Sequence, residues 1–148
     1  MATPYTVDEA DYQADFIISE NYIKFTAELL RLSLLAIAGF GALFVAKIKN
    51  EGLAAELDCS KFIVALVFFV ICSGACLCHR YFATDVMSWF ISLLRAQNNG
   101  NAAKAAIEEK GLHRTLLFSR IFLILSEISF GLGVIFFFIA IYNGIKAV

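Results

Sequence analysis

This 148-residue chain has little proline and few charged residues. Its single proline is Pro4, so no later residue breaks a helix in the way that proline does. Charged residues make up 17% of the chain and hydrophobic residues 60%, and the mean hydropathy is +0.76. This composition is unlike that of an ordinary soluble domain and indicates an integral membrane protein built from helices.

A basic N-terminal region is also missing. Residues 1–20 contain five carboxylates and no Lys or Arg, which is the reverse of the positive start of a secretory signal. We therefore expect the first membrane span to direct insertion. The formal net charge of −1 says little about partners, because the charges are segregated along the chain.

The residues that could carry chemistry lack the spacing of a metal or catalytic site. No Cys and His set has zinc spacing, and there is no glycine-rich phosphate loop or Ser/His/Asp grouping. Three of the cysteines fall in an apolar run, where cysteine behaves as a small hydrophobic residue. We predict no enzymatic activity, no cofactor and no metal. The residues considered are Cys59, Cys72, Cys76, Cys78, His79 and His113.

Three long uncharged runs predict three membrane spans. Residues 128–145 are 18 uncharged positions, which as a helix cover ~27 Å of the ~30 Å hydrocarbon core of a bilayer. Residues 62–78 add a second run of 17 uncharged positions. Residues 32–46 are a shorter run of 15, but Arg31 and Lys47 flank it and can extend their charged ends to the interface.

Each span is expected to continue as a helix beyond the membrane, over residues 8–31, 80–97 and 102–127. The second extension has an apolar stripe at steps of 4, 3 and 4, formed by Phe82, Val86, Trp89 and Leu93. The segment Asn98–Asn101 is the clearest turn signal in the chain. Gly111 leaves two alternatives open, a kink or a helix that continues into the third span.

The distribution of Lys and Arg predicts the topology. Three spans place the N-terminus and residues 79–120 on one side of the membrane, and that side carries eight of the 12 Lys and Arg residues. Because basic segments stay in the cytoplasm, the N-terminus should lie inside and the C-terminus outside. The predicted fold is a single all-α membrane domain over residues 1–148, with three transmembrane helices extended into a cytoplasmic helical stalk.

Glu127 is the only ionisable residue between Ile121 and Ile145. A charge in a membrane span is costly, and such residues pair with one another or line a pathway. The span lengths put Arg31 and Arg80 at the depth of Glu127, although Glu28 lies one turn from Arg31 and competes for it. An ion pair between helices and a place in a pore both remain open.

Small residues at helical spacing also point to close helix packing. In the third span they are Ser126, Ser129 and Gly133, and the first two spans contain Gly39 and Gly74. Small faces permit close approach of helices in lipid, either within one protomer or between protomers. We treat Ser126 and Ser129, with Glu127, as candidate pore or inter-helix residues.

Five basic residues of the extensions are candidate contacts for an anionic ligand such as a nucleotide or an oligonucleotide. They are Arg95, Lys104, Lys110, Arg114 and Arg120. Lipid headgroups and the usual excess of basic residues in cytoplasmic segments are the alternative explanations.

This arrangement of spans with long helices reaching into the cytoplasm, in a compact chain without catalytic residues, resembles the SLATT-like membrane effectors encoded beside nucleotidyltransferases in bacterial anti-phage systems. The resemblance rests on architecture over most of the chain, departs from a two-span pattern by a third span, and transfers no site residue. It implies a homo-oligomeric ion channel in the bacterial inner membrane, gated for antiviral defence by a nucleotide or nucleic-acid signal or by a cognate nucleotide-signalling enzyme. The alternative is a non-catalytic accessory subunit of a larger membrane complex. A small transporter is disfavoured by the lack of inverted repeats.

Overall fold

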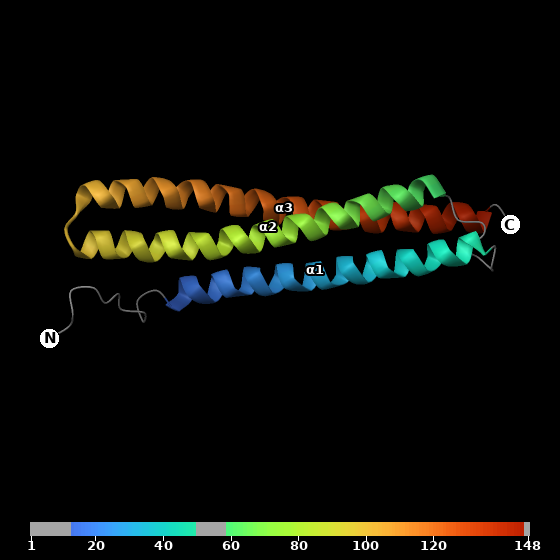
Figure 1. Ribbon diagram of the computed structural model, residues 1–148, viewed down its shortest axis with the longest axis horizontal. Coiled ribbons are helices and arrows are strands. Elements are labelled where there is room, and N and C mark those ends of the chain that lie inside the picture. Colours follow the sequence, from blue (N-terminus) through green and yellow to red (C-terminus); the bar gives the residue numbers. More distant parts are fainter. Residues whose placement is uncertain (1–12, 50–58, 147–148) are drawn as a thin grey trace. The chain divides into compact units, whose positions relative to one another are not determined.

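The computed structural model describes residues 13–49 and 59–146, which form three long helices that follow one another along the chain (Figure 1). They are α1 (Gln13–Ile48), α2 (Cys59–Asn98) and α3 (Ala102–Lys146). By length and composition all three are able to cross a membrane, which confirms the predicted fold class. The expected helical residues 8–12 lie outside the described part of the chain.

The helices are much longer than a bilayer requires. They have 36, 40 and 45 residues, or ~54, ~60 and ~68 Å, against a hydrocarbon core of ~30 Å. The helix α2 ends one residue beyond the expected limit of 97, and α3 begins at the expected residue, Ala102. Each apolar run therefore continues into a further helical segment without a break.

The predicted turn between α2 and α3 is present and is held by backbone hydrogen bonds. Gly100 has a φ of 66°, a left-handed conformation that suits glycine. The amide of Gly100 donates to the carbonyl of Gln97 (3.0 Å) and that of Asn101 to the carbonyl of Ala96 (3.1 Å), which closes the end of α2. The Asn101 side chain then caps α3, because its Oδ1 accepts from the amide of Lys104 at 3.0 Å.

Gly111 does not end or interrupt α3, so the second of the two alternatives for this residue is correct. Its role is to allow close approach of α2. A Cβ atom at this position would come within 2.7 Å of the Trp89 ring, whose Nε1 donates to Asp85 at 3.1 Å. The missing side chain of Gly111 thus provides the space that the indole fills.

The chain divides into two compact units, which we name by their helix segments. The span unit comprises residues 27–77 and 124–148, and the extension unit comprises residues 1–26 and 78–123. The span unit contains the three predicted spans except for Cys78. The extension unit contains most of the additional helical segments.

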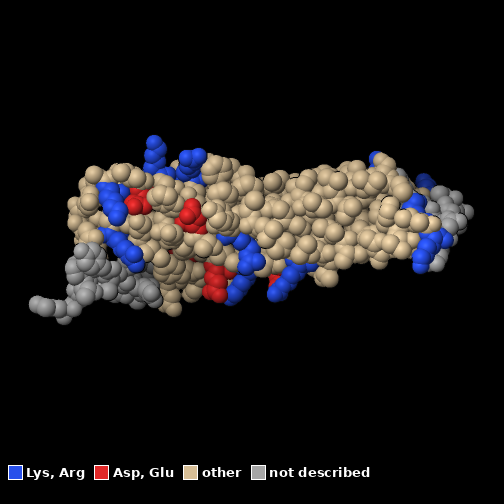
Figure 2. Space-filling view, in the orientation of Figure 1, with Lys and Arg blue, Asp and Glu red and all other residues tan. Residues whose placement is uncertain are grey.

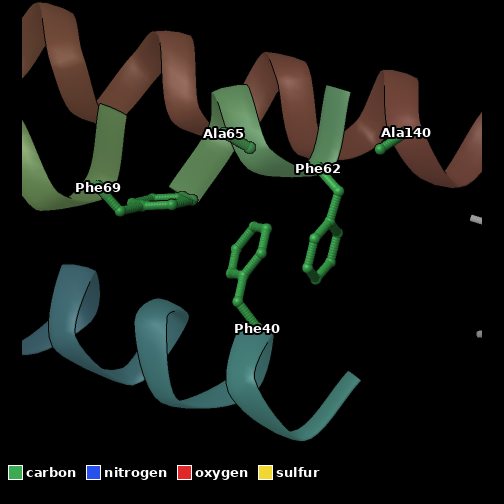
Figure 3. Close-up of a cluster of buried hydrophobic side chains, with 5 residues drawn as sticks. All are labelled: Phe40, Phe62, Ala65, Phe69 and Ala140. Carbon is green, nitrogen blue, oxygen red and sulfur yellow. The ribbon is translucent and has the colours of Figure 1, made fainter. Parts of the chain in front are cut away.

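Aromatic rings and small residues form the core of the span unit. Figure 3 shows Phe40 of α1 facing Phe62 and Phe69 of α2, with Ala65 of α2 and Ala140 of α3 beside them. The Phe40 ring lies 4.5 Å from that of Phe62 and 5.6 Å from that of Phe69. The ring of Phe137 on α3 lies 5.0 Å from that of Phe40, so all three helices contribute aromatic side chains to this core.

The extension unit is packed through the stripe predicted on α2. Val86 and Leu93 are buried, and the Phe82 ring stacks 5.5 Å from the rings of Phe118 and Phe122 on α3. This confirms that the stripe is a packing surface. Stacked aromatic pairs of this kind add to the stability that burial of their area provides.

Charged side chains are distributed differently over the two units. The span unit has no charged residue in 32–46, 62–77 or 128–145, and its Lys residues follow or precede these runs. On the face drawn in Figure 2 this uncharged surface is a broad tan area bounded by blue side chains. Each helix therefore has an uncharged stretch toward one end and charged residues along the rest of its length.

Candidate functional site

A layer of small polar side chains joins the three helices of the span unit. The hydroxyl oxygens of Ser33 on α1 and Ser73 on α2 lie 2.8 Å apart. Side-chain hydrogen bonds also connect Cys72 to Ser33 and to Cys76, and Cys76 to Ser126 on α3. We call these five residues the polar layer.

Each hydroxyl of the Ser33–Ser73 pair also lies near a carbonyl of its own helix. Ser33 Oγ is 2.9 Å from the Leu30 carbonyl oxygen, and Ser73 Oγ is 3.0 Å from that of Phe69. A serine in a helix that has no water beside it can satisfy its hydroxyl in this way. Each hydroxyl can therefore hydrogen-bond to its own helix, and the two hydroxyls also form one contact between α1 and α2.

The predicted small stripe of α3 faces the interior of the span unit. Ser126 and Ser129 are 0% and 3% exposed, and a Cβ at Gly133 would come within 3.2 Å of the Phe69 ring. Of the two alternatives for this stripe, packing within the protomer is the one formed. Gly39 and Gly74 are different, because a Cβ at either position would meet nothing within 4 Å.

Arg31 and Arg80 are both exposed. Arg31 forms an ion pair with Glu28, at 2.6 Å between Nη1 and Oε1, which confirms the local pairing considered from the sequence. Both side chains of this pair are largely exposed, so the pair contributes little to stability.

Glu127 lies on the outward surface of α3, although its neighbour Ser126 is completely buried. The flanking side chains Ile124 and Ile128 are 54% and 56% exposed. Among residues 13–49 and 59–146 no Lys, Arg or His nitrogen lies within ion-pair distance of the Glu127 carboxylate. The protomer therefore presents an acidic side chain on an otherwise apolar face.

The five basic candidate residues are all exposed and all belong to the extension unit. Arg95 is on α2, and Lys104, Lys110, Arg114 and Arg120 are on α3. The Arg114 guanidinium lies 5.9 Å from the centre of the Phe118 ring, a cation–π distance. Their exposure leaves them available to an anionic ligand or to lipid headgroups.

His79 is a buried polar residue that the sequence reasoning missed. It is 3% exposed, and its Nδ1 has no hydrogen-bond partner within the described ranges. The sequence signal was its spacing, because His79 continues the steps of 4 and 3 that begin at Cys72 and Cys76 and lead to Ala83 and Val86. The charged residue Arg80 next to it indicated an exposed position, so the burial of His79 was not predicted.

Within the described residues no group of three or more His, Cys, Asp or Glu side chains is arranged to hold a metal. Comparisons of the chain with protein-family models, with curated proteins and with solved structures found no match. The features that bear on function are therefore the polar layer, the outward Glu127 and the exposed faces of the helices.

Proposed function

We propose that this chain is a three-span membrane protein that assembles with copies of itself into an ion channel, with Glu127 beside the conduction path. The observation that carries the proposal is the outward carboxylate of Glu127, which forms no ion pair within the described residues of the protomer. A carboxylate within hydrocarbon costs about 3 kcal/mol on insertion scales. It needs water, headgroups or a cation from outside its own protomer, and a neighbouring copy that encloses water would meet that need.

Aromatic rings from all three helices occupy the interior of the span unit. Phe40 of α1 packs against Phe62 of α2 and Phe137 of α3, at ring distances of 4.5 and 5.0 Å. The most apolar windows of α1 and α3 are only 17% buried. A conduction path is therefore expected between protomers, where the outward faces of the helices meet.

The basic residues support an orientation of the chain in the membrane and offer contacts for a signal that gates the channel. An excess of Lys and Arg on the side of the extension unit favours an N-terminus inside and a C-terminus outside a bacterial inner membrane. The resemblance to SLATT-like effectors suggests that the exposed basic residues receive a nucleotide or nucleic-acid signal in antiviral defence. Arg114 and Arg120 are exposed and available for such contacts.

The test is ion flux through the purified protein in liposomes, with and without added nucleotides. Glu127→Gln should keep the oligomer intact and lower the preference for cations over anions severalfold, because it removes one negative charge per protomer beside the path. The matched control is Glu109→Gln, an exposed carboxylate of α3 in the extension unit, which should leave selectivity unchanged.

Two results would count against the channel. A discrete oligomer without ion flux under any of these conditions would remove the conducting function. A monomer that forms a stable complex only with a second protein would favour the accessory-subunit alternative. Mass measurement in detergent distinguishes the oligomer from the monomer, and recovery of the protein with the liposomes excludes a failed reconstitution.

A further inference from the structure

The outward helix faces of the extension unit are of two kinds. On α2 the exposed residues beyond Tyr81 include Thr84, Ser88 and Arg95, which are polar. On α1 the exposed residues include a stripe with Ile18 and Tyr22, at 54% and 51%, flanked by exposed polar residues such as Lys24. Both faces belong to the same unit. Water can hydrate the polar face of α2, whereas the apolar face of α1 would be more stable when a partner covers it.

Lipid tails cannot cover the apolar face of α1 along its whole length. The helix is ~54 Å long, and a ~30 Å hydrocarbon core takes up only ~39 Å of helix even at a tilt of ~40°. Lys47 marks the opposite end of the span, so the excess lies at the N-terminal end, which carries Asp15 and the ion pair of Glu20 with Lys24. Ile18 and Tyr22 fall in this part of α1.

The helix α3 has a second apolar face in the same unit. Leu117 and Ile121 are 53% and 47% exposed, and the stripe continues at steps of 3 and 4 through Ile124 and Ile128. The exposed residues Ile18, Tyr22 and Phe25 on α1 follow the same steps of 4 and 3. This spacing suits two helices that pack side by side at a small crossing angle.

Charge supports a pairing of α1 with α3. The described part of α1 in the extension unit, residues 13–26, has two acidic residues and one basic residue. The corresponding part of α3, residues 102–123, has four basic and two acidic residues. Opposite net charges on two segments favour their association and disfavour the pairing of either segment with itself.

We propose that Ile18, Tyr22 and Phe25 of one copy pack against Leu117 and Ile121 of a neighbouring copy. This inference rests on the homo-oligomer of the proposed function and specifies its contact surface. In a three-span protein α1 and α3 run in the same direction, so their N-terminal halves lie on the same side of the bilayer. An interface between two different faces repeats from copy to copy, and it forms a ring when its rotation closes.

Disulfide cross-linking between two differently marked chains tests this contact. The exposed native thiols are removed with Cys59→Ser and Cys78→Ser, and a chain with Tyr22→Cys is co-expressed with a chain carrying Leu117→Cys. Oxidation should shift both from 16.4 kDa to a mixed dimer of twice that mass. The matched control pairs Tyr22→Cys with Ser88→Cys on the polar face of α2, and should show no mixed dimer.

A second measurement uses charge in place of thiols. Ile18→Glu should shift the detergent-solubilised oligomer to monomers, whereas Thr84→Glu, at an exposed position of α2, should leave its mass unchanged. Loss of assembly in both variants, or in neither, would overturn the assigned surface.

Three further outcomes would also decide the question. Cross-linked dimers of the Tyr22→Cys chain alone would replace the proposed contact with one between two α1 helices. An oligomer that conducts ions without the mixed dimer would remove this interface and leave the proposed function standing. A fluorophore on Tyr22→Cys that shifts to the blue only when anionic vesicles are added would assign the face to the membrane surface instead.

Discussion

The span unit and the extension unit are built from the same three helices, but their interiors differ. In the span unit, the buried residues of α3 include Ser126, Ser129, Gly133 and Ala140, and the ring of Phe137 on the same helix packs against Phe40. In the extension unit, aromatic residues of α2 and α3 stack directly on one another, as Phe82 does with its two partners. Both interiors contain packed aromatic rings, and the span unit adds a layer of small polar side chains that contact one another between helices.

This difference matches the solvents that we propose for the two units. In lipid, apolar side chains gain little by leaving their surroundings, so helices are held by packing of small residues and by hydrogen bonds between polar ones. In water, burial of apolar area is the main stabilising contribution. The contrast between the two cores therefore predicts different sensitivities to substitution.

The largest effect should come from a charge placed in the core of the extension unit. Val86→Asp buries a carboxylate without a cation and should lower the free energy of unfolding by about 3 kcal/mol or more. Thermal unfolding in detergent, followed by circular dichroism, measures this loss. The matched control is Thr84→Asp, at an exposed position of the same helix, which should change the midpoint little. Equal effects of the two changes would contradict the observed orientation of α2.

Replacing three glycines of α3 with alanine should change the free energy of unfolding by three different amounts. Gly111→Ala forces a Cβ to within 2.7 Å of Trp89 and should cost roughly 1–3 kcal/mol, as overpacking does. Gly133→Ala, whose Cβ would lie 3.2 Å from Phe69, should cost less. Gly131→Ala meets nothing within 4 Å and should be neutral or gain up to about 1 kcal/mol of helix propensity. The same unfolding midpoints check the order, and a different order would argue against the packing of α2 on α3.

The smallest effect should come from the hydroxyl pair of the polar layer. Ser33→Ala and Ser73→Ala remove the 2.8 Å contact, and hydrogen bonds between membrane helices contribute about 0.6 kcal/mol on average and at most about 1.7. A double-mutant cycle on the unfolding free energy isolates the interaction of the two hydroxyls from their separate effects. A coupling energy of zero would show that each serine hydroxyl hydrogen-bonds only to a carbonyl of its own helix.

Features with a local cause were predictable from the sequence. The turn at Asn98–Asn101 follows from residues that stop one helix and cap the next. The packing stripe on α2 follows from the 3.6-residue period of a helix, which brings Val86 and Leu93 to one face. The three candidate spans follow from uncharged length alone.

Features that depend on pairs of helices were not predictable in the same way. The period of a helix shows which residues share a face, but it does not show which face of α3 meets α2. For that reason the small stripe with Ser126 was open to two alternatives, and the outward position of Glu127 could not be assigned. Gly111 was ambiguous because its role depends on Trp89, a residue of another helix.

The short connection between α2 and α3 has a consequence for how the chain folds. Closing a turn of a few residues costs little chain entropy, and Gly100 and Asn101 already direct the two helices back along each other. Contacts between α1 and α2 close longer segments, as the Ser33–Ser73 pair does across 40 positions. We therefore expect α2 and α3 to associate first as a helical hairpin, and α1 to join a surface that this hairpin has already formed.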